Sequence, residues 1–400
     1  MRAVGITAEY NPFHFGHLYQ LSRIRERFGA DVPVVAVMSG DFVQRGEAAV
    51  FSKFARAEAA VRCGVSLVLE LPLPWSLSSA EGFARGGIGV LQSVGAVDAF
   101  CFGSESGDGE GIRACAAALD TPEFSTALRR ALAEGVSFAA ARERALISLG
   151  LDGPEILRSP NDILGVEYIR AAKRLAFDAA FVPIPRDGTV HDGAGSASDL
   201  RRRMGESSDW LERIPPEAAA VFAREIREGR GPVLPEDLRL PLLSRLRERD
   251  RKDFAALPDA GEGLENLLFE ASRRESSPEA IAAAAKSKRY ALSRLRRMVT
   301  CAALGVRDGM ADGIPPYLRV LALDDRGAEV LRRMRENASL PVITKPAHIR
   351  KEDEDANAVF DLGSRAHDLY VLGFRDPTQQ TGGGDMRAAP FIYTREELTT

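Results

Sequence analysis

Two of the chain's five histidines, His14 and His17, stand three positions apart near the N-terminus, with Gly16 between them. They follow a short apolar run at 3–7 and open an amphipathic segment at 17–28. A helix N-terminus presents unpaired N–H groups and the positive end of the helix dipole, which suit it to phosphate. Glycine lets the backbone approach a phosphate, and two imidazoles can donate hydrogen bonds to charge developing on phosphorus or on leaving pyrophosphate. The pattern predicts a nucleotide-phosphate site, and a histidine-containing turn without a ligand is the alternative.

A second pattern, Ser-Ala-Ser-Asp-Leu-Arg, begins at Ser196 and follows another apolar run at 179–184. Hydroxyl groups and a guanidinium at the start of a helix can hold the outer phosphates of a nucleotide. Ser198 and Arg201 are the candidates for that role. An ordinary helix cap formed by Ser196 or Ser198 is the alternative.

Apolar runs alternate with amphipathic segments through the first half of the chain. The runs have the character of parallel strands buried on both faces, and they occupy 3–7, 32–38, 66–71, 96–102 and 179–184. The amphipathic segments predict helices at 17–28, 53–63, 80–94 and 162–175. This alternation predicts an α/β fold with a Rossmann-like, doubly wound parallel sheet, in which ligands bind beyond the carboxyl ends of the strands. The histidine pair follows the first such strand.

The pattern changes near residue 206, where strand signals become scarce. Helices are predicted at 209–230, 241–256, 262–273 and 278–304. From 316 a short alternation returns, with an apolar run, a helix at 326–336 and a second run. The sequence therefore predicts a Rossmann-like nucleotide-binding domain at 1–205, a helical region at 206–315 and a small C-terminal α/β segment at 316–400. The stretch TGGGD at 381–385 is predicted to be a loop.

The predicted helix at 278–304 is strongly basic and has no acidic residue between Ala280 and Val306. Its six basic residues are Lys286, Lys288, Arg289, Arg294, Arg296 and Arg297. Leu292, Leu295 and Val299 share one face that can pack inward, which leaves the basic residues to follow a nucleic-acid backbone. A solvated basic face is the alternative. A second run, Arg245 to Lys252, is diluted by two acidic residues and carries less weight.

Composition is that of an ordinary globular protein, with 45% hydrophobic and 28% charged residues and a net charge of −4. No signal peptide or membrane-spanning run is evident, so a soluble, cytoplasmic protein is expected. The four cysteines form no CxxC pair, which predicts free, buried thiols and neither a zinc site nor a disulfide framework. No dedicated metal site is visible.

The histidine pair and the later S-x-S/T-x-[IL]-R pattern are the mark of the nucleotidyltransferase α/β-phosphodiesterase superfamily. Longer segments narrow the match. EYNPFHFGH, VMSGDFVQRGE, LVLELPLPWSLSSAEGFA, SPNDILGVEYI, HDGAGSASDLR and SKRYALSRLRR occur in this order. PPYLRVLALDDRG and LPVITKPA follow. Together they resemble the bacterial tRNA(Met) cytidine acetate ligases over nearly the whole chain.

The resemblance implies that acetate reacts with ATP, accompanied by Mg²⁺, to give acetyl-adenylate and pyrophosphate. The acetyl group then passes to N4 of the wobble cytidine in elongator tRNA(Met). It implies catalytic roles at the phosphates for His14 and His17. It further implies that ATP is bound by the loop and helix start made of Thr7, Ala8, Glu9, Tyr10, Asn11, Pro12, Phe13, His14, Phe15, Gly16, His17, Leu18, Tyr19 and Gln20.

By the same resemblance, Gly103 lets the nucleotide lie against the backbone, and Asn161 contacts it, although a helix cap is the alternative for Asn161. Arg186 meets phosphate or adenine. The second strand is followed by Asp41, Gln44 and Arg45. These side chains either face acetate or the cytidine, or they belong to a solvated loop. Glu70 lies within an apolar strand and needs a partner, in a structural ion pair or in the site. The sequence assigns no role to His191 and does not define the oligomeric state.

Two other functions remain open from the sequence. The first is a nucleotidyltransferase that moves AMP onto a small phosphate substrate. The second is a non-catalytic RNA-binding or assembly factor with a relict nucleotide pocket, against which the intact His14, Gly16 and His17 count.

Overall fold

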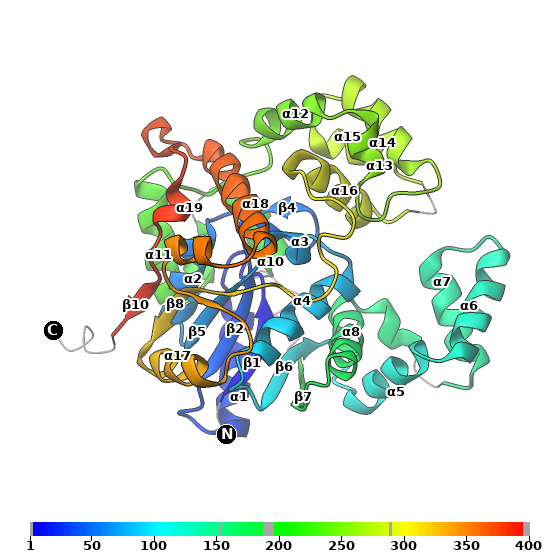
Figure 1. The fold of residues 1–400 in the computed structure, drawn as a ribbon, viewed down its shortest axis with the longest axis horizontal. Coiled ribbons are helices and arrows are strands. Elements are labelled where there is room, and N and C mark those ends of the chain that lie inside the picture. The colour runs from blue at the N-terminus through cyan, green and yellow to red at the C-terminus, as the bar shows by residue number, and fades with distance from the viewer. Residues whose placement is uncertain (1–2, 152–153, 187–195, 208, 288–289, 395–400) are drawn as a thin grey trace.

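In a computed structural model of the chain, residues 3–151, 154–186, 196–207, 209–287 and 290–394 are described. One twisted sheet runs through the molecule, with strands in the order β10-β8-β5-β2-β1-β6-β7 and β9 paired with β8 (Figure 1). Its strands are β1 Val4–Ala8, β2 Val34–Ser39, β5 Leu67–Leu71, β6 Ala99–Ser104, β7 Ala180–Pro185, β8 Leu318–Asp324, β9 Val342–Ile343 and β10 Phe391–Tyr393. The five strands expected from the sequence are present, each within three residues of its predicted ends, and they run parallel to one another.

Strand order reverses at β1, which lies between β2 and β6. The connections between strands on one side of β1 cross one face of the sheet, and those on the other side of β1 cross the opposite face. A crevice therefore opens beyond the carboxyl ends of β1 and β6. The doubly wound architecture predicted from the sequence is confirmed.

Both faces of the sheet are covered by helices, because successive residues of each central strand point to opposite sides. On β2, Val35 and Val37 belong to one hydrophobic core, while Val34, Ala36 and Met38 belong to the other. The first core is closed by α4 Ala80–Ser93, α8 Pro160–Arg174 and α17 Asp325–Asn337. The second is closed by α1 Phe15–Phe28, α2 Lys53–Arg62, α10 Ala197–Met204 and α11 Pro216–Arg227.

A third core lies in a separate lobe of helices (Figure 1). Its helices are α12 Arg239–Glu248, α13 Arg251–Ala255, α14 Leu264–Arg274, α15 Pro278–Ala284 and α16 Leu292–Leu304. The long helix α18 Glu354–Tyr370 packs against it through Leu362, Ala366 and Tyr370. Within the described ranges no helix combines the length and apolar character needed to cross a bilayer. The four cysteines are free and buried, as expected.

Three of the predicted long helices are wrong, because each is divided in the structure. The helix expected at 209–230 is a 3-10 helix at Asp209–Arg213 followed by α11, since Pro215 stands between them and Pro216 begins α11. The helix expected at 278–304 is α15 followed by α16, since 286–291 offers only Tyr290 and Ala291 as apolar residues and the apolar faces of both helices pack on one core. The helix expected at 241–256 breaks before α13, where Asp250 accepts hydrogen bonds from the N–H groups of Lys252 and Asp253 and so starts a new helix.

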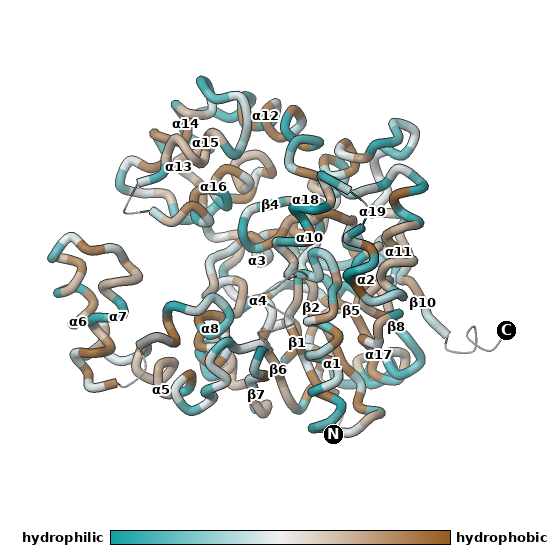
Figure 2. The backbone as a smooth tube through the Cα atoms, turned by 180° about the vertical axis from the view of Figure 1, so that it is seen from behind, coloured by the Kyte–Doolittle hydropathy of each residue, from teal (hydrophilic) through white to brown (hydrophobic). Residues whose placement is uncertain are grey.

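Other elements carry no expectation from the sequence. They include α5 Gly109–Leu119, α6 Pro122–Ala133 and α7 Phe138–Ser148, and the α6–α7 hairpin projects from the body in both views (Figures 1 and 2). The hairpin β3 Phe42–Val43 and β4 Glu47–Ala48 follows β2, and α3 Leu73–Ser76 follows β5. Short helix α19 Gly384–Arg387 begins inside the stretch 381–385, which was predicted to be a loop.

The strands after residue 316 extend the same sheet: β8 lies antiparallel to β5, and β10 pairs with β8. The three-part division of the chain stays a prediction.

Candidate active site

A cavity of about 620 Å³ opens beyond the carboxyl ends of β1 and β6, where the strand order reverses. Its walls come from the loop after β1, the turn between β3 and β4, and helices α4, α8 and α16. A smaller cavity of about 190 Å³ shares Glu9, His14, Arg45 and Arg186 with the first and adds residues at the start of α10. Most residues predicted to bind nucleotide line one of these two cavities: Thr7, Ala8, Glu9, Asn11, His14, Gly16, His17, Tyr19, Gln20, Gly103, Asn161, Arg186, Ser198 and Arg201.

The two histidines are fixed by the backbone at the start of α1. His14 is the N-cap, and its Nδ1 accepts the N–H of Gly16 at 3.0 Å, while Nδ1 of His17 accepts the N–H of His14 at 3.2 Å. The rings lie against each other with centroids 3.9 Å apart. Because each Nδ1 accepts a hydrogen bond, the proton of each neutral imidazole is assigned to Nε2. The turn thus orients two Nε2–H donors at a helix N-terminus.

Five other residues of this loop do not line either cavity. Tyr10 and Phe13 are buried, and their rings pack against the His17 ring with centroids 4.8 and 5.3 Å away. Pro12 is buried and Leu18 packs against the core, whereas Phe15 is 44% exposed. The aromatic packing holds His17 in place, which suggests positioning for Tyr10 and Phe13.

The second sequence pattern meets the first at the smaller cavity. Ser196 caps α10 by accepting the N–H of Asp199 at 3.2 Å, which confirms the helix cap that was the alternative for this residue. The guanidinium of Arg201 donates to the carbonyl of Asn11 at 2.9 Å and to the hydroxyl of Ser198 at 3.4 Å. Arg201 therefore connects the two predicted phosphate loops, and Ser198 stays available beside it.

Glu105, two residues beyond Gly103, organises the other side of the cavity. Its carboxylate accepts the side-chain amide of Asn161 at 2.7 Å and the guanidinium of Arg186 at 3.2 Å. Asn161 is not the helix cap, because Ser159 occupies the N-cap position of α8. Buried Asp162 accepts the Ser104 hydroxyl at 2.5 Å and the Ser106 N–H at 3.0 Å, which ties the end of β6 to α8.

The turn between β3 and β4 brings Gln44 and Arg45 to the larger cavity. The N–H of Gln44 donates to the Glu9 carboxylate at 2.9 Å. Burial raises the pKa of Glu9, although that hydrogen bond and the nearby charges of Arg45 and Arg201 act in the opposite direction. Glu9 is therefore a poorly solvated carboxyl group beside the histidines.

The same turn packs against α16, so the helical lobe forms a wall of the cavity. Ser293, Arg296 and Arg297 line the cavity from the first two turns of α16. Arg296 pairs with Glu47 at 2.9 Å, and the Thr300 hydroxyl donates to the carbonyl of Gly46 at 2.7 Å. Gly46 has a φ of +78°, and a Cβ there would lie 2.4 Å from the backbone nitrogen of Arg297.

The basic residues of α16 are less exposed than the sequence predicts. Arg297 lies 3.6 Å from Asp259, and Arg294 donates to the backbone carbonyl of Asp259 at 2.7 Å. Lys288 and Arg289 lie outside the described residues, as does His191.

Several residues that shape the cavity gave no functional signal in the sequence. Arg56 is fully buried on α2, and its guanidinium donates to the backbone carbonyls of Glu9, Gly40 and Phe51. It thereby connects the loop after β1 to the segment after β2. Apolar side chains complete the walls: Phe83, Phe102, Ile163, Leu164 and Tyr168. In the sequence such residues are typical of the buried core of a helix or strand. Only their position in the fold distinguishes them from ordinary core residues.

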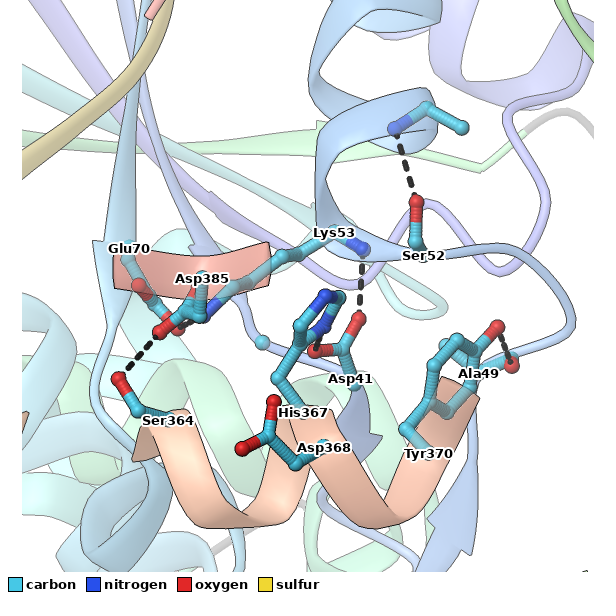
Figure 3. Close-up of polar contacts among 12 residues, drawn as sticks. Asp41, Ala49, Ser52, Lys53, Glu70, Ser364, His367, Asp368, Tyr370 and Asp385 are labelled. Atoms are coloured by element: carbon cyan, nitrogen blue, oxygen red, sulfur yellow. Dashed lines mark hydrogen bonds and ion pairs between the residues drawn. The ribbon is translucent and has the colours of Figure 1, made fainter. Parts of the chain in front are cut away.

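Two of the undecided residues, Asp41 and Glu70, belong to a buried ionic cluster (Figure 3). Lys53 contacts Glu70 and Asp385, each at 2.8 Å, and Arg319 contacts the same two carboxylates at 3.0 and 2.9 Å. The Ser364 hydroxyl also donates to Asp385 at 2.8 Å. Glu70 therefore has a structural ion pair.

Asp41 links this cluster to α18. One oxygen accepts the backbone N–H of Lys53 at 2.7 Å, and the other lies 2.8 Å from Nδ1 of His367. Burial alone would raise the pKa of Asp41, but His367 and Lys53 hold it below its usual value. Asp41 anchors the start of the β3–β4 hairpin instead of facing the cavity.

The fold and the paired histidines define a nucleotidyl transferase of the HIGH class. The family model described as HIGH Nucleotidyl Transferase matches residues 1–385. The tRNA(Met) cytidine acetate ligase of Alkaliphilus metalliredigens is 34% identical over the full length of both chains. That of Fervidobacterium nodosum is 37% identical over 94% of this chain and 92% of its own. This chain belongs to the tRNA(Met) cytidine acetate ligase family.

Solved structures agree with this assignment. Thermotoga maritima TmcAL bound with alpha-thio ATP superposes with a TM-score of 0.92 at 35% identity, covering 98% of this chain and 100% of that one. The apo form of the same protein gives the same values.

Proposed function

We propose that this chain acetylates N4 of the wobble cytidine in elongator tRNA(Met), using acetate and ATP through an acetyl-adenylate. The observation that carries this proposal is the pair of histidines at the start of α1, His14 and His17, whose Nδ1 atoms each accept a backbone N–H, in a cavity that α16 also lines. The names of the relatives support the substrates, and the ATP analogue bound to Thermotoga maritima TmcAL supports the nucleotide.

In the first step, a carboxylate oxygen of acetate attacks the α-phosphorus of ATP. A P–O bond forms, the bond to the β-phosphate oxygen breaks, and pyrophosphate leaves with the electron pair. His14 and His17 donate hydrogen bonds to the charge that builds on the phosphates, and they need no reorganisation because the turn already holds them. Arg186, Arg201 and Ser198 bind the remaining phosphate oxygens, and Thr7, Gly103 and Asn161 lie along the nucleoside.

In the second step, N4 of cytidine attacks the carbonyl carbon of acetyl-adenylate. The N–C bond forms, the C–O bond to AMP breaks, and the amine loses a proton. The exocyclic amine is a weak nucleophile because its lone pair is delocalised into the ring, so a strongly activated acyl donor is needed. A base in the single-stranded anticodon loop can be turned out into a pocket. Ser293, Arg296 and Arg297 of α16 line the same cavity, and we propose that this wall receives the base.

Magnesium enters this scheme with ATP. Among the described residues no group of three His, Cys, Asp or Glu side chains is arranged to hold a metal ion. Mg²⁺ keeps several waters and commonly binds through substrate phosphates, so phosphate oxygens and water are its expected ligands here.

Incubation with ATP, labelled acetate and tRNA tests the whole proposal. We expect mass spectrometry of the digested tRNA to find one labelled N4-acetylcytidine per elongator tRNA(Met), and none in a transcript carrying uridine at the wobble position. A transferase that moves AMP onto a small phosphate substrate would instead show pyrophosphate release that acetate does not stimulate. A non-catalytic RNA-binding factor would turn over no ATP even with tRNA present.

Replacing Gly16 tests whether the turn accommodates phosphate. We expect Gly16→Val to weaken ATP binding on the order of tenfold or more, because a branched side chain occupies the space in which phosphate approaches the helix N-terminus. Isothermal titration calorimetry measures the affinity, and thermal unfolding confirms that the variant is folded. Gly363→Val on α18 is a control, since a Cβ there meets no neighbouring atom within 4 Å and its backbone lies outside the left-handed region. Unchanged ATP affinity in folded Gly16→Val would rule out phosphate binding at this turn.

A further inference from the structure

Four arginines from separate segments converge on a second cavity, of about 300 Å³, at the far end of α16. Arg245 lies on α12 and Arg249 directly after it, Arg307 follows α16, and Arg365 lies on α18. Two of them, Arg245 and Arg249, belong to the basic run at 245–252. The cavity is distinct from the active site, since α16 lines the first cavity near its start and this one near its end.

The charges around this cavity do not balance. Arg245 pairs with Glu248 at 2.6 Å, and Arg307 lies 3.5 Å from Asp253, which is the one acidic residue lining the cavity. Four guanidinium groups against these two carboxylates leave a net charge of +2. Arg365 is exposed, and within the described ranges it forms no hydrogen bond or ion pair. Like charges gathered in one cavity favour an anionic ligand.

The wall of this cavity has apolar parts as well as charged ones, so it suits a ligand that has a charged side and an apolar side. Leu257, Leu362 and Met310 form apolar parts of its wall. The carbonyl groups at the end of α16 would disfavour an anion, but Arg249 donates to the Ala302 carbonyl at 3.0 Å and covers part of that end. The planar guanidinium groups match the paired oxygens of a phosphate.

We propose that this arginine cavity binds a backbone phosphate of the tRNA substrate and so positions the RNA along α16. This inference rests on the proposed function for the identity of the RNA. A helix of 13 residues is roughly 20 Å long, so the cavity holds the RNA at a point well removed from the reacting base. The contact is independent of base identity and sets the register in which the wobble cytidine reaches the active site.

The test is the double variant Arg245→Ala/Arg365→Ala, which removes two exposed guanidinium groups and leaves the helix-end contact of Arg249 intact. We expect tRNA affinity to fall on the order of tenfold or more. The slope of log affinity against log salt should flatten by roughly 0.7–0.9 for each lost contact. Acetate-dependent ATP–pyrophosphate exchange without tRNA should stay at the wild-type rate. The matched control is Arg332→Ala/Arg333→Ala on α17, which removes the same charge from exposed positions on another face.

Unchanged tRNA affinity and salt slope in the arginine-cavity variant would overturn the inference. So would equal losses in the two double variants, because the effect would then be one of net charge. A stabilisation of the wild type by inorganic phosphate that the variant loses, with tRNA affinity unchanged, would assign the cavity to a free anion instead. Failure of the proposed function looks different, since the wild type itself would then leave tRNA unacetylated.

Discussion

Acetate-dependent ATP–pyrophosphate exchange by folded His17→Ala is expected to be about 10²–10³-fold slower than in the wild type. Loss of one preorganised donor to developing charge typically has an effect of this size. The Nε2–H of His17 is such a donor, held by the bond from the His14 N–H to Nδ1 and by the packing of Tyr10 and Phe13. Exchange of labelled pyrophosphate into ATP measures this step without tRNA.

Two further substitutions separate donation from helix capping. His17→Asn keeps an acceptor near the position of Nδ1 but has no group at Nε2, whereas His17→Gln places an amide N–H near Nε2. We expect the asparagine variant to be as slow as alanine and the glutamine variant to recover part of the rate. If asparagine restored the rate, His17 would act by capping the helix, and the proposed phosphate contact would be wrong. His348→Ala, at an exposed position away from the cavity, is the control.

Substitution of Asp385 is expected to have the largest effect on stability. We expect Asp385→Ala to lower the free energy of unfolding by about 3–5 kcal/mol, because removing one partner of a buried ion pair leaves charge without compensation. Lys53 and Arg319 would retain only Glu70 between them. Urea unfolding followed by circular dichroism measures the change. Asp361→Ala breaks an exposed pair with Arg350 and should cost at most about 1 kcal/mol.

The same carboxylate gives a pH dependence with a definite sign. Burial alone would raise the pKa of Asp385, but Lys53 and Arg319 hold it far below its usual value. A carboxyl group whose pKa is lower in the folded state stabilises the protein above its unfolded pKa of about 3.9, and this contribution is lost as the pH falls below it. Wild-type stability should therefore fall from roughly pH 5 downward more steeply than that of Asp385→Ala. Parallel curves would mean that Asp385 is not ionised in the folded protein.

The histidine turn could be predicted from the sequence because its chemistry is local. His14, Gly16 and His17 fall within four residues, and a strand and a helix flank them, so spacing alone places them at the end of β1. The second phosphate pattern is also local in the sequence, but the contact of Arg201 with the Asn11 carbonyl, which joins the two loops, needed the fold. The placement of these side chains on ATP stays a prediction.

Contacts between segments that are distant in the chain could not be predicted from the sequence. Nothing in the sequence around Asp41, just after β2, or around His367, within α18, indicates that the two side chains meet. Nor does the sequence indicate that Arg56 connects two loops of the site. The helices divided at Asp250 and at 286–291 were missed for a related reason. Periodicity alone continues a helix through such points, and the turn is decided by which apolar faces must share a core.

The buried cluster has a consequence for the order in which the protein can mature. Lys53 and Glu70 form a neutral pair that is made early in synthesis, whereas Arg319 and then Asp385, which complete the charge balance, are made much later. A nascent chain that has produced Arg319 but not Asp385 therefore carries two cations, Lys53 and Arg319, against the single carboxylate of Glu70. We expect a protein stopped before α19 to keep one buried cation without compensation and so to be less stable than the whole chain.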